Sequence, residues 1–327
     1  MENVNPIDAD WLFGKSTAPS LFFVNILSSA RLTRHLSNLT MNTDISVLII
    51  TRNRVETLLW TLTHLVALPE EPPIIVVDNA STDGTPERVR AAFPTVNVVA
   101  LSTNQGLNSR NIGVRAAQTP LVAFCDDDSF WEPGALTKAV HYFRQYTHLG
   151  VLAGKVLLGE EERLEPVCEA MRDSPLTSQL PLPGPAILGF VCCAVVIRRQ
   201  AFLAMGGFNQ QFAIAGEERL FSVDMLASGW SLSYAEDMVC RHYPSPVRDC
   251  SHRIQLLTRD TLWYYWLRRP WYYALRHTLH IQQRSRYDEN VRKGYRAALR
   301  VLLSLLPKRR VVPIHVERQI LKIESFY

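Results

Sequence analysis

The sequence predicts an α/β fold in which a mostly parallel central sheet is flanked by helices. Three apolar segments without a charged residue are typical of strands buried on both faces: Ile45–Thr51, 74–77 and 121–125. Segments with helical spacing separate them. Strands that alternate with helices favour a parallel sheet with right-handed crossovers.

The first half of the chain continues this alternation. Leu58, Leu62 and Leu65 share one side of a helix predicted over 54–68, which Pro72 and Pro73 end. Residues 78–85 have the sequence DNASTDGT, which is rich in residue types that favour turns and therefore predicts a turn. Further elements predicted here are helices over 86–93 and 106–117 and a strand over 96–101.

The second half is patterned less regularly. We predict a strand over 150–156, and a long loop over 159–185 because this segment is acidic first and then rich in proline. The longest apolar run, 187–197, has 11 residues and predicts a buried strand. The other elements expected are a loop over 206–215, a helix over 217–228 ended by Gly229, short strands over 231–234 and 238–240, and a helical tail.

Charge divides the chain unevenly. Residues 1–240 carry 17 Lys and Arg against 25 Asp and Glu, whereas residues 241–327 carry 18 against 6. An acidic body and a basic tail suggest a catalytic part and an electrostatic docking part. We therefore expect an N-terminal extension over 1–43, a main domain over 44–245 and a helical, basic and aromatic region over 246–327. Met41 opens the regular part, which leaves open whether residues 1–40 are native.

No sequence feature predicts export or a membrane span. No apolar run reaches the ~18–20 residues of a spanning helix, and the first 30 residues lack the pattern of a secretory signal. The six cysteines show no C-x-x-C spacing, which is typical of reduced, buried thiols. The 47% hydrophobic content excludes disordered and disulfide-scaffold classes. We expect a cytoplasmic protein, with the inner face of the membrane as an alternative location.

The strongest signal for chemistry is the run Asp126-Asp127-Asp128, directly after a predicted strand. Ligands of open α/β sheets bind at the carboxyl ends of strands. Three adjacent carboxylates repel one another unless a cation compensates them. Mg²⁺ or Mn²⁺ carrying a diphosphate would do so, because both ions prefer hard oxygen ligands. The alternative is a solvated turn or a helix cap.

Other polar residues also follow predicted strands. Asp78 could accept a hydrogen bond from a base N–H or a ribose hydroxyl, or it could form an Asx turn. A helix N-terminus with a nearby arginine could face phosphate, although the arginines also suit a solvated surface. The glycine spacing fits neither G-x-G-x-x-G nor a P-loop, which argues against a dehydrogenase or a P-loop ATPase. The candidate phosphate-facing residues are Thr51, Arg52, Arg54, Asn104, Gly106 and Arg110.

An acidic pair and one histidine complete the set of candidates. Glu217 and Glu218 begin a predicted helix, whose positive end favours ionised carboxylates. An ionised carboxylate could act as the general base for a hydroxyl group. The alternative is charge complementarity with the helix end alone. His242 follows a short strand and is a candidate third metal ligand, or else a packed histidine.

Together these pieces resemble one family. The ordered segments TRNR, VVDNASTDG, NQGLNSRNIG, FCDDDSFWEPG, GEE and RHYPSP are similar to those of family 2 glycosyltransferases, which have the Rossmann-like GT-A fold. Bacterial surface-polysaccharide members, such as rhamnosyltransferase-like enzymes, are most similar. The resemblance covers about residues 44–245. It implies an inverting transfer of a sugar from a nucleotide sugar to a hydroxyl group, with Mn²⁺ or Mg²⁺ as cofactor.

The resemblance implies roles on the donor side. Asp78 matches the base-recognising aspartate, and Thr51 and Arg52 match the strand tip that borders the nucleotide. We also expect the other phosphate-facing residues, together with Asp126 and Asp127, to contact the donor. The donor would be a UDP-, dTDP- or GDP-sugar.

The resemblance also implies a metal site and a base. Asp126 and Asp128 match the ends of a D-x-D motif, with Asp128 a direct metal ligand, and His242 matches a late histidine that can complete the site. The pair Glu217-Glu218 stands where the family usually has Glu-Asp, whose second member is the base. This departure leaves open which of the two glutamates acts.

The basic tail combines arginines with many aromatic residues. Segment 262–281 holds three Trp, four Tyr and three Arg, and Pro270 is expected to break it into two short helices. Segment 295–306 is a second amphipathic piece. This composition suits a peripheral membrane contact near a lipid-linked acceptor; the alternative is a packed subdomain with aromatic residues in its core or in a homodimer interface. The basic residues lie among bulky apolar ones, which argues against nucleic-acid binding.

The leading hypothesis is a metal-dependent hexosyl- or deoxyhexosyltransferase of cell-surface polysaccharide or glycoconjugate biosynthesis, with a glycan or lipid-linked acceptor. A catalytically degenerate nucleotide-sugar-binding or scaffold protein is the first alternative. A nucleotidyltransferase is a weaker one, because it would need an early glycine-rich phosphate loop. The sequence does not identify the sugar, the base, the acceptor or the oligomeric state.

Overall fold

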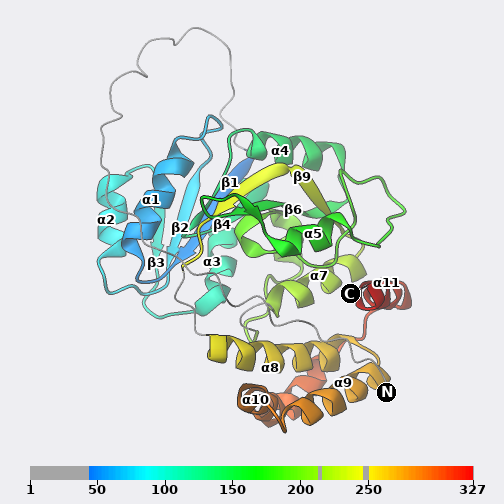
Figure 1. Cartoon of the computed structure of the whole chain (residues 1–327). Helices are drawn as coiled ribbons and strands as arrows, with labels where there is room; N and C mark the ends of the chain where they lie inside the picture. The colour runs from blue at the N-terminus through cyan, green and yellow to red at the C-terminus, as the bar shows by residue number, and fades with distance from the viewer. Residues whose placement is uncertain (1–43, 213–215, 246–249, 327) are drawn as a thin grey trace, which may run out of the picture.

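The structure, a computed structural model, describes residues 44–212, 216–245 and 250–326, without the side chain of Cys250. The extension predicted over 1–43 and part of the loop predicted over 206–215 lie outside the described residues. In Figure 1 the central sheet lies above a layer of C-terminal helices. The predicted α/β class with a helical C-terminal region is confirmed.

Nine strands of the described residues form one sheet, in the order β3-β2-β1-β4-β8-β6-β9-β5, with β7 paired to β6. Strand β1 (Ile45–Thr51) pairs in parallel with β2 (Ile74–Asp78) and with β4 (Leu121–Asp126), and β3 (Asn97–Ala100) pairs in parallel with β2. This half of the sheet has the predicted parallel order. The remaining strands are β5 (Ser129–Trp131), β6 (Leu149–Leu158), β7 (Arg163–Leu164), β8 (Val195–Arg198) and β9 (Ser231–His242).

The other half of the sheet is mixed. Strand β8 runs antiparallel to both of its neighbours, β4 and β6, and β5 runs antiparallel to β9, whereas β6 and β9 are parallel. The apolar pattern of a buried strand is the same for either direction, so the sequence could not distinguish these pairings.

Three predictions in this half are wrong in detail. The apolar run 187–197 is a strand only at its end, in β8, and Cys192–Ala194 form a short 3₁₀ helix. Residues 159–185 contain β7 and the helix α5 (Pro166–Arg172), so they are not one loop. The two short strands expected over 231–240 are one strand, β9, whose register against β6 shifts near Gly154. A fully apolar run is buried in either conformation, so periodicity could not separate a strand from a buried loop.

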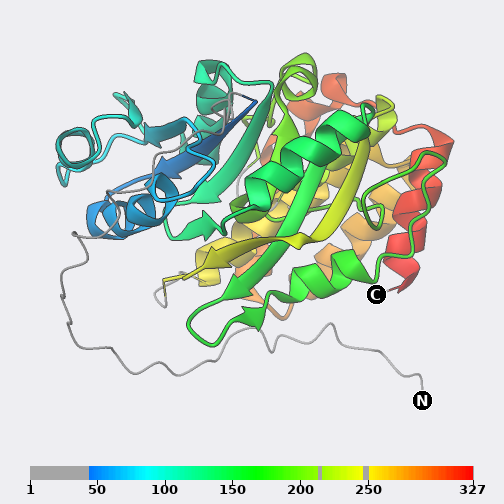
Figure 2. The same ribbon diagram turned by 90° about the horizontal axis from the view of Figure 1, so that it is seen from above.

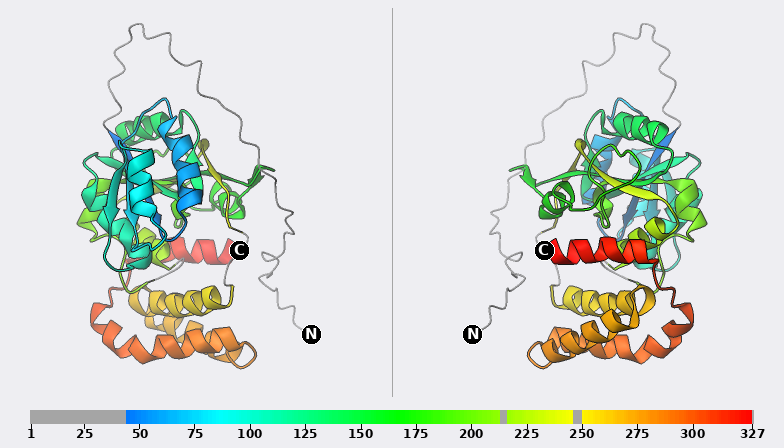
Figure 3. Two further views of the ribbon diagram at one scale, coloured as in Figure 1. Left: turned by 90° about the vertical axis from the view of Figure 1, so that its left-hand side faces the viewer. Right: turned by 90° about the vertical axis from the view of Figure 1, so that its right-hand side faces the viewer.

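Helices lie above and below the sheet. Figures 1 and 3 show α4 above it and α7 beneath it, and from above α4 covers the β6–β9 half (Figure 2). Helix α3 approaches β1 closely, because a Cβ at Gly113 would lie 2.1 Å from the Leu48 side chain. The helices of this part are α1 (Val55–Val66), α2 (Thr85–Ala92), α3 (Ser109–Ala116), α4 (Ala135–Gln145), α6 (Arg199–Ala204) and α7 (Glu217–Ala227).

The C-terminal region contains four further helices in its described part. Pro270 separates the first two, as predicted, but both are longer than expected, with 19 and 14 residues. Their apolar side chains join Phe212, Leu220 and Val223 in a second hydrophobic core, distinct from the core of the sheet. The region therefore packs on the loop and helix that precede β9. The helices are α8 (Cys250–Arg268), α9 (Trp271–Arg284), α10 (Glu289–Leu305) and α11 (Ile314–Phe326).

The five cysteines whose side chains are described are buried and unbridged, as predicted. No helix in 44–212, 216–245 or 250–326 is long and apolar enough to cross a membrane.

A buried arginine fixes α11 against α8. The guanidinium of Arg269 is fully buried, and its Nε lies 3.0 and 2.9 Å from the two carboxylate oxygens of Glu317. A second carboxylate, Glu324, accepts from Nη1 and Nη2 at 2.5 and 3.1 Å. The guanidinium also lies over the rings of Tyr265 and Tyr273. A buried charge is tolerated only when it is paired in this way.

We expect Glu317→Ala to destabilise the protein by about 3 kcal/mol, because it leaves Arg269 partly uncompensated in the core. The matched control is Glu289→Ala, which removes an exposed ion pair with Arg292 and should cost less than about 1 kcal/mol. Urea unfolding followed by circular dichroism measures both. Equal losses in the two variants would show that the buried network does not stabilise the fold.

Candidate active site

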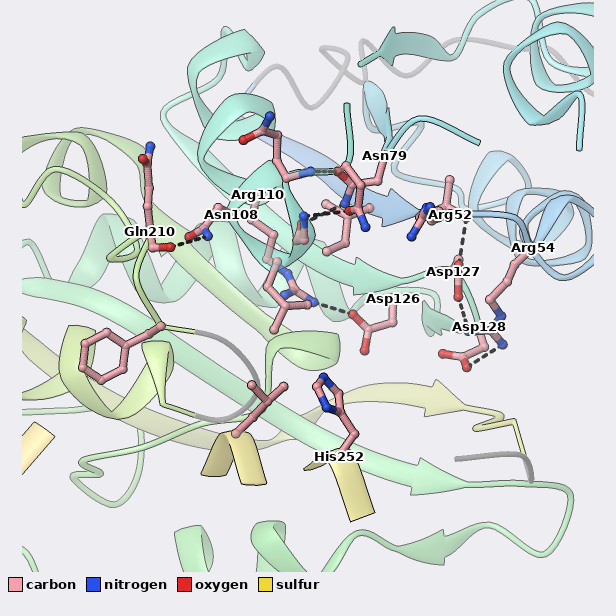
Figure 4. A pocket seen from close by; sticks show the side chains of 18 of the residues that line it. Arg52, Arg54, Asn79, Asn108, Arg110, Asp126, Asp127, Asp128, Gln210 and His252 are labelled. Atoms are coloured by element: carbon pink, nitrogen blue, oxygen red, sulfur yellow. Dashed lines mark hydrogen bonds and ion pairs between the residues drawn. The ribbon is translucent and has the colours of Figure 1, made fainter. Parts of the chain in front are cut away.

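The carboxyl ends of three parallel strands meet at one edge of the sheet. Thr51 at the end of β1 is in register with Asp78 at the end of β2, and Ile50 is in register with Asp126 of β4. A cleft of about 920 Å³ opens at this edge (Figure 4). Its lining includes Thr51, Arg52, Arg54, Asn104, Gly106, Arg110, Asp126, Asp127, Asp128 and His242, all of which the sequence analysis predicted.

Each aspartate of the run 126–128 has a cationic partner. Arg110 Nη2 donates to Asp126 Oδ1 at 2.6 Å, and Arg54 donates to Asp127 at 2.5 Å and to Asp128 at 3.0 Å. Asp127 and Asp128 are only 6% and 4% exposed. The run is therefore not a solvated turn, and the compensation that the sequence argument required is partly supplied by protein side chains.

Asp127 and Asp128 differ in their electrostatic surroundings. Burial raises the pKa of Asp127 to about 7, although Arg54 and the Thr51 hydroxyl, 2.8 Å away, favour its ionised form. Burial would also raise the pKa of Asp128, but the hydrogen bond and charge of His242, together with Arg54, lower it below its usual value. Asp128 therefore ionises more readily than a free aspartate.

Two carboxylates and one imidazole form a candidate metal centre. Single ligand atoms of Asp126, Asp128 and His242 all lie within 4.8 Å of one another, and His242 Nε2 is 3.2 Å from Asp128 Oδ1. Carboxylate oxygens with one imidazole suit Mn²⁺, and carboxylates with water suit Mg²⁺. The donor set therefore fits the cation that the sequence analysis predicted.

Asp78 has an unusual environment for a carboxylate. It is 1% exposed, and one oxygen accepts from the Ser81 N–H at 3.0 Å. The other oxygen, Oδ1, is buried with no hydrogen-bond partner among the described residues. Asp83 serves the following turn, since it accepts from Val55 N, Thr85 N and Thr85 Oγ1. Asp78 thus retains an acceptor for a ligand, although it does not line the cleft wall itself.

Asn79 was missed by the sequence analysis and connects the donor-side loops. Its Nδ2 donates to Gly106 O at 2.8 Å and to Ser109 Oγ at 2.9 Å, and its Oδ1 accepts from Gln105 N at 2.9 Å. Asn104 in turn accepts from Gly106 N at 2.8 Å. The sequence feature that could have identified Asn79 is its position directly after Asp78 in a turn-forming run.

The acidic pair lies beside a second cavity of about 690 Å³. Glu218 lines this cavity, whereas Glu217 lines neither cavity and is 1% exposed. Arg110, Asp126 and His242 line both cavities, so the two adjoin at the candidate metal centre. The structure therefore brings Glu218 to a cavity that Asp126 also lines, whereas Glu217 is buried away from both cavities.

Burial raises the pKa of both glutamates. The repulsion from Glu218 raises the pKa of Glu217 further, and the Arg110 charge and a hydrogen bond with Cys192 only partly offset the effect on Glu218. One buried oxygen of each, Glu217 Oε1 and Glu218 Oε2, has no hydrogen-bond partner among the described residues. The pair thus holds protons more tightly than exposed glutamates do.

Residues of the C-terminal region also line both cavities. His252 of α8 faces the first cleft from the side opposite the aspartates (Figure 4), and Leu256 and Arg259 line it as well. Arg253 of α8 and Ile323 of α11 line the second cavity. No sequence pattern linked these residues to the site, because the contact arises only from the packing of α8 and α11.

Comparison with known proteins places the sheet part of the chain in a family. Residues 46–206 match the model of Glycosyl transferase family 2, so the chain carries a domain of this family. The expected resemblance is thereby confirmed.

Two curated relatives match shorter segments. The succinoglycan biosynthesis protein ExoU of Rhizobium meliloti is 32% identical over 98 residues, which is 29% of this chain and 29% of that protein. The uncharacterized glycosyltransferase YwdF of Bacillus subtilis is 35% identical over 100 residues, 29% of this chain and 36% of that protein. The matches therefore span about a third of each relative's own length.

Solved structures share the fold at low identity. GalNAc-T7 with UDP, GalNAc and Mn²⁺ has a TM-score of 0.53 and 15% identity, covering 80% of this chain and 56% of that one. S. aureus TarS 1-349 with UDP-GlcNAc has a TM-score of 0.51 and 20% identity, covering 67% and 66%. The predicted GT-A fold is confirmed by these neighbours.

We expect Glu217→Gln to stabilise the protein by about 1–3 kcal/mol at about pH 9 and by less at about pH 5. A carboxyl whose pKa is raised by folding stabilises the native state below its unfolded pKa, and this contribution is lost as the pH rises through the folded value. Glutamine does not ionise, so the variant does not undergo this loss of stability at high pH. Urea unfolding at the two pH values measures it, with exposed Glu87→Gln as the control. A benefit that does not grow with pH would contradict the assigned burial effect.

Proposed function

We propose that this protein is a metal-dependent glycosyltransferase that moves a sugar from a nucleotide-sugar donor to a hydroxyl acceptor. The observation that carries the proposal is the adjoining pair of cavities. One holds the carboxylates at the ends of the strands, the other holds Glu218, and Asp126 and His242 line both. A donor in the first cavity would have its sugar beside the acceptor in the second. The names of the relatives and the nucleotide-bound fold neighbours agree with this chemistry.

The first cavity suits a UDP-, dTDP- or GDP-sugar. The free acceptor oxygen of Asp78 would receive a hydrogen bond from the base or ribose, and Thr51 and Arg52 would border the nucleotide. Arg54, Asn104, Gly106, Arg110 and Asp127 would contact the phosphates and sugar, directly or by holding neighbours in place.

In the proposed reaction Glu218 acts as the general base. Its carboxylate takes the proton of the acceptor hydroxyl while the acceptor oxygen bonds to the anomeric carbon, and the bond from that carbon to the diphosphate breaks on the opposite side. The configuration of the sugar is therefore inverted. Mn²⁺ or Mg²⁺ held by Asp126, Asp128 and His242 would supply neutralisation of the charge that develops on the leaving diphosphate. Burial raises the pKa of Glu218, so the ionised carboxylate would hold the proton that it takes more tightly than an exposed glutamate.

The second cavity indicates an acceptor with an apolar part. Its wall includes Met171, Leu188, Phe190, Val191 and Ile323, with Arg219 and Arg253 among the charged residues. A lipid-linked saccharide or a glycan with deoxy sugars combines such surfaces with the hydroxyl that Glu218 would activate. We therefore propose hexosyl or deoxyhexosyl transfer in cell-surface polysaccharide or glycoconjugate synthesis, and the relative ExoU is named for the biosynthesis of succinoglycan. We also retain the division into 44–245 and 246–327 as a proposal.

We expect calorimetric titration to detect micromolar binding of one of UDP, dTDP or GDP, and to find it dependent on Mn²⁺. Asp128→Asn should weaken the metal-dependent part by more than about tenfold, because it removes a ligand charge. Exposed Asp237→Asn is the control. Binding of no nucleotide by a folded sample would favour the degenerate scaffold protein and contradict the donor site.

We expect Glu218→Gln to lower the rate of donor cleavage by about 10²–10⁴-fold with little change in nucleotide affinity. The assay is release of the nucleotide from the donor that the titration identifies, with water or a simple glycoside as acceptor. Glu218→Asp should retain more activity, because it keeps the carboxylate. A larger loss in Glu217→Gln than in Glu218→Gln would transfer the role of base to Glu217.

A further inference from the structure

Helices α9 and α10 form the outermost layer of the molecule at the end away from the sheet. In Figures 1 and 3 they lie beyond α8, and both contact α8. The inner side of α9 is buried through Ala274 and Ile281, and that of α10 through Val291, Ala298 and Leu305. Their opposite sides have no covering element among the described residues.

The uncovered sides carry large apolar residues at helical spacing. Tyr272, Leu275 and Leu279 of α9 are 66%, 52% and 65% exposed, and Leu299 and Leu303 of α10 are 42% and 81% exposed. Each set recurs at intervals of three, four or seven residues, so each forms one side of its helix. Arginines lie on the same sides. We call the following set the α9–α10 face: Tyr272, Leu275, Arg276, Leu279, Arg296, Leu299, Arg300 and Leu303.

The charge around this face is strongly positive. Segment 271–311 contains ten Lys and Arg and two acidic residues, Asp288 and Glu289. Both acids are engaged locally: Asp288 caps α10 by accepting from Asn290 N and Val291 N, and Glu289 pairs with Arg292. The basic charge of the face is therefore available to an external anionic partner.

We infer that the α9–α10 face docks on an anionic phospholipid surface. Apolar and aromatic residues that alternate with arginines on a helix lying parallel to the interface are the combination that such surfaces select. The described helices do not cross a membrane, so the contact would be peripheral. The exposed arginines favour an anionic lipid over a second copy of this chain, which would bring the same positive charges together.

This docking would place the site close to the lipid. Helix α8 lies between the α9–α10 face and the sheet, and its residues His252, Leu256 and Arg259 line the first cleft. Two helix layers, α9–α10 and then α8, would then separate the lipid from the cleft, which is roughly 20 Å. The inference does not depend on the proposed transfer reaction, because it rests only on the surface of α9 and α10.

Vesicle flotation with the full chain tests the inference. We expect binding to vesicles that contain phosphatidylglycerol, weaker binding at high salt, and little binding to phosphatidylcholine alone. The double variants Leu279→Asp with Leu303→Asp, and Arg276→Glu with Arg300→Glu, should each bind at least about tenfold more weakly. The control is Leu180→Asp, which makes the same change at a 49% exposed leucine in the loop before β8.

Each other outcome overturns the inference. Absence of binding to the anionic vesicles, or equal binding by the face variants and the control, would exclude lipid docking. Light scattering that shows a dimer in the parent and a monomer in the leucine variant, without lipid binding, would assign the face to a second copy. Circular dichroism of each variant checks that the fold is intact, and this readout does not depend on the proposed transfer activity.

Discussion

The concentration of negative charge at the end of β4 is the constraint on which the site depends. Asp127 and Asp128 are almost fully buried, so their charges are tolerated only because cationic and hydrogen-bonding groups surround them. Arg54 lies between these two, and Arg110 reaches Asp126 from another helix. The strand ends and the N-terminal parts of α1 and α3 must therefore come together for the fold to be stable.

The same constraint connects the donor side to the acceptor side. Arg110 is 4% exposed, lines both cavities and bonds to Asp126, and its charge also acts on Glu218. Removing the charge of Asp126 or of Glu218 would change the electrostatic field at the other residue. The raised pKa values of Glu217 and Glu218 show the cost of this arrangement, because burial disfavours the ionised form of both carboxyl groups and the charge of Glu218 adds to the effect on Glu217. Such local destabilisation is common where proton transfer is needed.

The C-terminal helices line the candidate active site and also form an outer surface of the molecule. The inner face of α8 lines the first cleft, and α11, held by the Arg269 pairs with Glu317 and Glu324, contributes Ile323 to the second cavity. The outer helices leave apolar and basic side chains uncovered. One helical layer can thus complete a binding cavity on one side and present a docking surface on the other.

The sequence by itself determined the alternation of strands and helices, the parallel half of the sheet and the aspartates that follow β2 and β4, because these depend on local periodicity and chain order. Only the tertiary structure decided the antiparallel direction of β8, the position of Glu218 beside Asp126, and the contribution of His252. These depend on contacts between residues far apart in the chain, which leave no local pattern. The apolar run before β8 could not be assigned for the same reason, since burial alone does not specify a strand.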